Sequence, residues 1–167
     1  MASTAPQAAL HNVFVYGSLL ADDVVHILLN RVPQYSPAIL HGYHRFSIKG
    51  RVYPAILPLE NKKVTGRVLL GITPPELFIL DTFEDVEYER KAVEVQLMDS
   101  SEKLLAETYV WSNMTDPNLY GDWNFEEWER LHKEEFMKMS TGFMEELEMP
   151  ESKTRVATYE EFFQQKD

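Results

Sequence analysis

The chain has 167 residues, of which 44% are hydrophobic, and this is enough to form the core of one compact domain. Its 27 acidic and 16 basic residues give a net charge of −11, which argues against binding to nucleic acid or to anionic membranes. It has no cysteine, which excludes disulfides, thiolate nucleophiles and cysteine-ligated metals. No stretch has the pattern of a signal peptide or the length of a membrane span, so we expect a cytoplasmic protein.

The sequence pattern of the N-terminal part predicts an arm, then a strand, then a helix. Residues 1–10 are rich in Ala, Ser and Pro and are predicted to form a flexible arm. Residues 13–16 are a continuous apolar run, typical of a strand that is buried on both faces. After Gly17 and Ser18, Asp22 and Asp23 mark the start of a helix. The apolar side of this helix is formed by Val24, Val25, Ile27, Leu28 and Leu29.

The middle of the chain predicts strands that flank one helix. Residues 38–48, 53–59 and 63–72 have the pattern of separate strands, punctuated by Gly and Pro and by Asn61. Thr73 is the expected N-cap of a helix that ends near Glu84, with Pro74 in its first turn and Glu76 completing a capping box. Two further strands are predicted at residues 88–98 and 104–112.

The C-terminal part predicts one long helix. Asn124 is the expected N-cap and Glu127 completes a second capping box. An apolar stripe of helical period follows, made of Phe125, Trp128, Leu131, Phe136, Met139, Phe143 and Leu147. Residues 11–149 are therefore expected to form one α+β domain, and residues 150–167 a polar tail with a short turn near residues 159–163.

The turn at Gly17 and Ser18 is the first candidate functional motif. A glycine after a buried strand lets the backbone turn sharply and approach a ligand closely. If the N–H groups of Gly17, Ser18 and Leu19 point the same way, they form a nest that binds an anion. The alternative is an ordinary turn between strand and helix whose N–H groups bind water. The residues alone leave both interpretations open.

The second candidate motif is the acidic segment around Glu84. Asp81, Glu84, Asp85, Glu87 and Glu89 surround the apolar Leu80 and Phe83. A carboxylate at the end of an apolar helix is partly desolvated, which raises its pKa toward the range of a general base. The alternative is a set of solvated surface carboxylates. Tyr88 and Arg90 can supply a hydroxyl and a cation to a ligand, or simply lie on a strand.

The segments "VFVYGSL", "YPAI", "GRVLLGI" and "LDTFEDVEYERKAV" occur in this order, and together they resemble the gamma-glutamylcyclotransferase-like superfamily. The tryptophan-rich segment "GDWNFEEWERLHKEEF" is similar to the plant branch of that superfamily, the avirulence-induced proteins. The resemblance covers residues 12–145. It implies an α+β fold in which a small mixed β-barrel is surrounded by helices and followed by a long C-terminal helix.

The resemblance also implies roles for individual residues. Glu84 corresponds to the catalytic general base. Tyr88 and Arg90 match a Tyr-x-Arg pattern that supports the site. The substrate's alpha-carboxylate and amine would be held by Tyr16, Gly17, Ser18 and Leu19, which are flanked by Val15 and Leu20.

The implied reaction is attack of a substrate's own alpha-amine on its gamma-amide carbonyl, which forms 5-oxoproline. The implied partner is a small gamma-glutamyl molecule, without metal or cofactor. One alternative is hydrolysis or acyl transfer at the same site. Another is a catalytically silent protein of the same fold that binds a small carboxylate or regulates a stress response. His41 and His44 are expected on opposite faces of a strand, which argues against a metal site. The sequence names no protein partner.

Overall fold

The structure of the protein is a computed structural model that describes residues 9–147. The expected tail at residues 150–167 and most of the expected N-terminal arm lie outside these residues. The described strands are β1 (His11–Val15), β2 (Tyr35–Ile48), β3 (Ala55–Ile72), β4 (Tyr88–Leu97), β5 (Lys103–Trp111) and β6 (Leu119–Tyr120). The described α-helices are α1 (Asp22–Leu29), α2 (Pro74–Glu84), α3 (Phe125–Leu131) and α4 (Lys133–Leu147), and the short 3-10 turns are η1 (Ser18–Leu20) and η2 (Asp85–Glu87).

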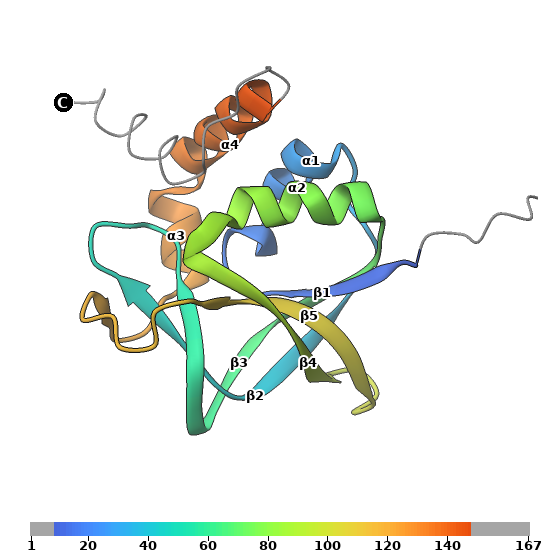
Figure 1. Cartoon of the computed structure of the whole chain (residues 1–167), viewed down its shortest axis with the longest axis vertical. Coiled ribbons are helices and arrows are strands. Elements are labelled where there is room, and N and C mark those ends of the chain that lie inside the picture. The colour runs from blue at the N-terminus through green and yellow to red at the C-terminus, as the bar shows by residue number, and fades with distance from the viewer. Residues whose placement is uncertain (1–8, 148–167) are drawn as a thin grey trace, which may run out of the picture.

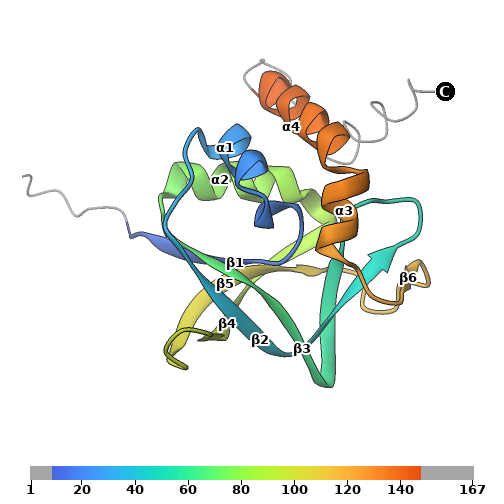
Figure 2. The same ribbon diagram turned by 180° about the vertical axis from the view of Figure 1, so that it is seen from behind.

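The first five strands close into a barrel. β1 pairs with β3 on one side and with β5 on the other, while β4 and β2 complete the ring between β5 and β3. The β1–β5 pair is parallel and the other pairs are antiparallel, so the barrel is mixed. The helices gather at one end of this barrel (Figures 1 and 2). The predicted α+β class with a small mixed barrel is therefore confirmed.

The sequence signals that predicted the starts of α1 and α2 are confirmed. α1 begins at Asp22, as its acidic first turn indicated. At the start of α2, the Thr73 hydroxyl accepts the N–H of Glu76 at 3.3 Å, and the Thr73 N–H donates to the Glu76 carboxylate at 3.0 Å. This is the predicted capping box, and α2 ends at Glu84 as expected. A capping signal acts within one helical turn, so it could be found without knowing the barrel.

The prediction of two strands at residues 53–59 and 63–72 is wrong, because the single strand β3 runs through residues 55–72. Asn61 has a positive φ of 64°, but the strand does not end there. Opposite it, the pairing of β2 with β3 shifts register between His41 and Tyr43. The turn-forming residues therefore make an irregularity within a long hairpin rather than a loop between strands.

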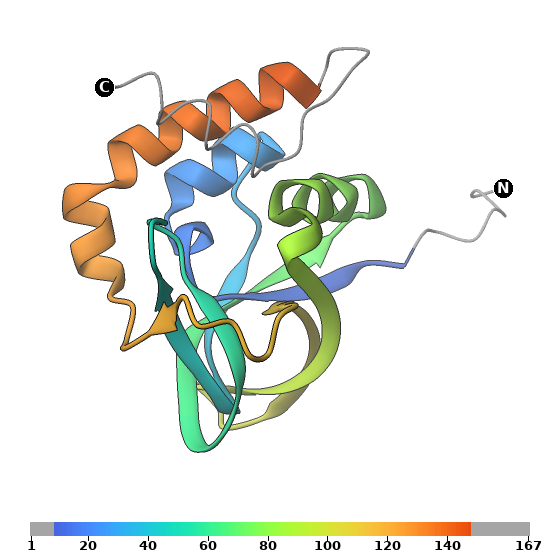
Figure 3. The same ribbon diagram turned by 60° about the vertical axis from the view of Figure 1, so that its left-hand side comes forward.

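The prediction of one continuous C-terminal helix is also wrong. Asn124 does cap a helix, since its side chain accepts the N–H of Glu127 at 2.7 Å, but α3 stops at Leu131 and α4 starts at Lys133. His132, between them, has a non-helical φ of −129°. Leu131 of the expected apolar stripe is 54% exposed. The break changes the direction of the chain, so that both helices follow the end of the barrel and α4 lies over α1 (Figure 3).

Aromatic side chains join α2 to the C-terminal helices. Phe83 of α2 packs edge-to-face on Phe136 and Phe143 of α4, with ring centroids 6.0 and 5.2 Å apart. Trp128 of α3 packs on Phe136 at 5.6 Å, and all four rings are buried. This cluster immobilises the C-terminal end of α2, which carries Glu84. None of the helices within residues 9–147 is both long and apolar enough to cross a membrane.

Candidate active site

A small pocket lies where β1 ends, and it collects both candidate motifs. Its volume of about 20 Å³ is room for one water molecule. Seven of the nine predicted site residues line it, and Leu20 and Arg90 do not. The complete lining is Phe14, Val15, Tyr16, Gly17, Ser18, Leu19, Tyr53, Pro54, Glu84, Tyr88 and Tyr109.

The turn after β1 is closed by two hydrogen bonds between residues three apart in the chain. The N–H of Leu20 donates to the carbonyl of Gly17 at 2.9 Å, and the N–H of Ala21 donates to the carbonyl of Ser18 at 3.0 Å. The preceding N–H groups, those of Gly17, Ser18 and Leu19, have no acceptor inside the turn, as at the start of any helix. All three residues line the pocket, so their N–H groups are candidate donors to an anionic ligand there.

Glu84 enters the pocket from the last position of α2. Its neighbour Tyr109 comes from β5, and the Tyr109 hydroxyl donates to Asp81 at 2.7 Å. Burial raises the pKa of Tyr109 well above its usual value, and the charges of Asp81 and Glu84 raise it further. Tyr109 is therefore a neutral hydroxyl at physiological pH. The pocket holds a carboxylate and a phenol side by side, together with a row of backbone donors.

The comparisons with known proteins agree with this arrangement of motifs. Residues 13–129 match the sequence profile of the family described as "Gamma-glutamyl cyclotransferase, AIG2-like". The chain belongs to this family. It is 62% identical to AIG2-like protein D of Arabidopsis thaliana over 144 residues, which cover 86% of this chain and 95% of that protein.

Solved structures show the same fold. The solution structure of another Arabidopsis thaliana protein is 46% identical, has a TM-score of 0.65 and covers 90% of this chain and 100% of that chain. A structure titled "Gamma-glutamyl cyclotransferase" has a TM-score of 0.55, covers 63% of this chain and 68% of that chain, and is 19% identical. At that identity the second likeness establishes the fold alone.

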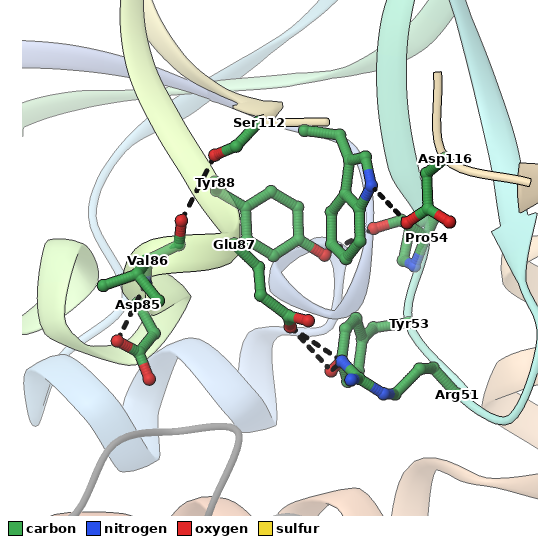
Figure 4. A network of polar contacts seen from close by, with 10 residues as sticks. Arg51, Tyr53, Pro54, Asp85, Val86, Glu87, Tyr88, Ser112 and Asp116 are labelled. Atoms are coloured by element: carbon green, nitrogen blue, oxygen red, sulfur yellow. Dashed lines mark hydrogen bonds and ion pairs between the residues drawn. The ribbon is translucent and has the colours of Figure 1, made fainter. Parts of the chain in front are cut away.

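In this AIG2-like chain, two pocket tyrosines use their hydroxyls to hold the backbone. The Tyr88 hydroxyl donates to the carbonyl of Pro54 at 2.7 Å, and the Tyr16 hydroxyl donates to the carbonyl of Tyr109 at 2.5 Å. Figure 4 shows Tyr88 pointing from β4 toward Pro54. Tyr88 and Tyr16 therefore fix the positions of two other residues that line the pocket.

An ion pair lies beside the pocket wall. Arg51 donates to Glu87 Oε1 at 2.7 Å and to the hydroxyl of Tyr53, which lines the pocket (Figure 4). Burial on its own would lower the pKa of Arg51, but its hydrogen bond to Glu87 and its contact with Tyr53 raise the pKa overall. The pair connects the segment between β2 and β3 to η2, directly after Glu84.

Arg90 was predicted to support the site, but it does not line the pocket. Its guanidinium lies 3.5 Å from Asp81 and 2.9 Å from Glu107, and Glu107 also contacts His11 at 2.6 Å. Asp81, which Arg90 contacts, also accepts the hydrogen bond of the pocket residue Tyr109. Within residues 9–147 there is no group of three His, Cys, Asp or Glu side chains arranged to hold a metal ion.

Four lining residues were not assigned to the site from the sequence: Phe14, Tyr53, Pro54 and Tyr109. Tyr53 and Pro54 belong to the "YPAI" segment, so the family pattern could have indicated them. Tyr109 carries no such signal. It lies on β5, and only the closure of the barrel brings that strand beside β1.

Proposed function

We propose that this protein is a gamma-glutamyl cyclotransferase that releases 5-oxoproline from a small gamma-glutamyl amine or amino acid. The observation that carries the proposal is that Glu84 and the turn residues Gly17, Ser18 and Leu19 line the same pocket. A site that only bound an anionic glutamyl group would gain nothing from a carboxylate placed inside it. Membership of the family described as "Gamma-glutamyl cyclotransferase, AIG2-like" supports the same function.

The backbone donors of Gly17, Ser18 and Leu19 would bind the alpha-carboxylate of the substrate. This contact restricts the flexible glutamyl stem and brings its alpha-amine close to its gamma-carbonyl carbon. Well-oriented intramolecular reactions reach effective molarities of about 10⁵ M or more. Most of the rate enhancement would therefore come from orientation by the turn.

Glu84 would manage the proton. It takes one proton from the alpha-ammonium group, and the free amine then attacks the gamma-carbonyl carbon. A C–N bond forms to close the five-membered ring, and the C–N bond to the departing amine breaks. Glu84 returns this proton to the departing nitrogen, which also takes the second proton that the attacking nitrogen loses as the ring closes, so that the products are 5-oxoproline and a protonated free amine or amino acid. No outside nucleophile takes part.

The size of the pocket adds a condition to this mechanism. A volume of about 20 Å³ is smaller than a glutamyl group, so we expect the lining side chains to move apart when the substrate binds. The Arg51–Glu87 pair spans the two segments that flank Tyr53 and Glu84. Opening would therefore separate or shift this pair.

The test is 5-oxoproline release from gamma-glutamyl dipeptides, gamma-glutamyl-lysine and glutathione, compared between wild type and Glu84→Gln. We expect release by the wild type and a loss of about 10²–10⁴-fold in the variant. Glu89→Gln is the matched control, since it removes one charge from an exposed residue outside the pocket. Equal release by wild type and Glu84→Gln would exclude Glu84 as the base. Binding of gamma-glutamyl ligands without any turnover would favour the alternative interpretation, that of a catalytically silent carboxylate-binding protein.

A further inference from the structure

Two arginines hold the carbonyl groups of the turn after β1. Arg45 of β2 donates to the carbonyl of Tyr16 at 2.7 Å and to that of Thr65 at 3.2 Å. Arg67 of β3 donates to the carbonyl of Leu19 at 2.9 Å. The turn is thus held at both ends by guanidinium groups that do not line the pocket.

The charge of Arg67 is compensated. Its side chain is 8% exposed, it pairs with Asp22 at 2.6 Å, and it lies over the ring of Tyr35 at 4.4 Å. The carbonyl that it holds belongs to the peptide whose N–H, that of Leu20, already donates to Gly17. Arg67 therefore stabilises the shape of the turn without adding a free charge or a free donor to the pocket.

Arg45 lacks an ion pair like the one that Arg67 makes with Asp22, although its guanidinium also lies over an aromatic ring, that of Trp123, at 5.4 Å. Within the described part of the chain, no carboxylate lies within 4.0 Å of Arg45, and the Nε atoms of Arg45 and Arg67 are both buried without a hydrogen-bond partner. Burial lowers the pKa of Arg45, and the more distant Glu126, Tyr16 and Asp122 offset part of that effect. A guanidinium stays protonated at neutral pH despite such a shift. The guanidinium of Arg45 therefore places a positive charge next to the carbonyl of Tyr16, at the start of the turn.

The peptide that Arg45 holds is the one that carries a pocket donor. The carbonyl of Tyr16 and the N–H of Gly17 belong to the same planar peptide and point in opposite directions. A hydrogen bond from Arg45 to the carbonyl therefore fixes the direction of the Gly17 N–H. A cation at the oxygen end of a peptide also polarises it and strengthens its N–H as a donor.

We propose that Arg45 is a positioning residue that aims the Gly17 N–H at the substrate and makes the site selective for an anionic alpha-carboxylate. This inference rests on the proposed function and deepens it. The substrates are gamma-glutamyl compounds with a free alpha-carboxylate, and their alpha-carboxamide analogues are excluded. Arg67 serves as the internal comparison, because it makes the same kind of hydrogen bond to the same turn while its own charge is paired with Asp22.

The experiment measures ligand binding by calorimetry in a Glu84→Gln background, in which the substrate persists. The ligands are gamma-glutamyl-alanine and the same compound with its alpha-carboxylate replaced by a carboxamide. Arg45→Gln keeps an N–H donor and removes the charge, whereas Arg45→Lys keeps the charge. Arg67→Gln is the matched control, and the melting temperature of each variant reports its folding.

We expect Arg45→Gln to weaken binding of the carboxylate ligand about tenfold, equivalent to 1.4 kcal/mol, and to leave the carboxamide ligand almost unchanged. Arg45→Lys should retain the preference for the carboxylate, and it carries the test if Arg45→Gln does not fold. Arg67→Gln should lower the melting temperature and change both ligands by the same factor.

Three results would overturn the assignment of Arg45. They are an equal loss for both ligands in Arg45→Gln, no loss for either, and loss of the preference in Arg45→Lys. Failure of the Glu84→Gln parent to bind either ligand would remove the proposed function together with this inference. The two failures are therefore distinguishable.

Discussion

Gly17 packs against the ring of Pro54 so closely that no side chain fits between them. A Cβ atom on Gly17 would lie 2.8 Å from Cδ and 2.9 Å from Cγ of Pro54. The carbonyl of Pro54 is in turn held by the hydroxyl of Tyr88 at 2.7 Å. The glycine of the turn after β1 is therefore required by its close contact with Pro54, which also lines the pocket.

Gly17→Ala should accordingly displace the turn. Overpacking of this kind typically costs about 1–3 kcal/mol. We expect a loss of that size in urea unfolding and at least tenfold weaker binding of a gamma-glutamyl ligand. Gly142→Ala is the control, since a Cβ there meets nothing within 4 Å and α4 gains a better helix former. Unchanged ligand binding in Gly17→Ala would contradict the close packing.

Gly66→Ala should be more severe. A Cβ on Gly66 would lie 2.2 Å from the backbone carbonyl oxygen of Val15, where β3 carries the end of β1. Backbone atoms held in a strand cannot give way as a side chain can. We expect a loss of about 3 kcal/mol or more in the free energy of unfolding, measured in urea. Stability equal to that of wild type would show that β1 does not pack closely against Gly66.

The Arg51–Glu87 pair should contribute measurable coupling. Its side chains are 20% and 22% exposed, and its atoms lie 2.7 Å apart. A double-mutant cycle with Arg51→Met and Glu87→Gln should give about 1–2 kcal/mol of interaction free energy. The same cycle on Glu134 and Lys138, an exposed pair at 4.0 Å, should give no more than about 0.5 kcal/mol. Equal coupling in both pairs would argue against a connection beside the pocket.

Tyr109 should impose an alkaline limit on stability. In the unfolded chain its pKa is the ordinary tyrosine value of about 10, and in the fold its pKa is higher. Below pH 10 both states hold the proton and stability does not depend on it. Above pH 10 unfolding releases the proton, so stability falls by about 1.4 kcal/mol per pH unit.

The check is urea unfolding of wild type and Tyr109→Phe between pH 8 and pH 11. The variant loses the hydrogen bond to Asp81 and should be less stable at pH 8. This deficit should shrink as the pH rises past 10, since only the wild type carries the titrating phenol. A deficit that stays constant over the whole range would show that Tyr109 has an ordinary pKa.

Local chemistry explains which structural predictions succeeded. The starts of α1, α2 and α3 were predictable because their capping and first-turn residues act over about one helical turn. The break at His132 was missed because the stripe from Phe125 to Leu147 has helical spacing on both sides of it. Where the chain turns there is decided by the surface on which α3 and α4 pack. The same holds for β3, whose turn residues form the extra residues of an irregularity opposite the β2 segment between His41 and Tyr43.

By itself, the sequence determined the fold class, the turn after β1 and the acidic end of α2, since each depends on residues that are neighbours in the chain. Family resemblance joined the two motifs into one candidate site. Only the tertiary structure decided that Tyr109 borders Glu84 and that Arg45 holds Tyr16. It also decided that Arg90 lies apart from the pocket lining. These relationships depend on strand register and barrel closure, which bring together residues far apart in the chain and follow from the packing of the whole core.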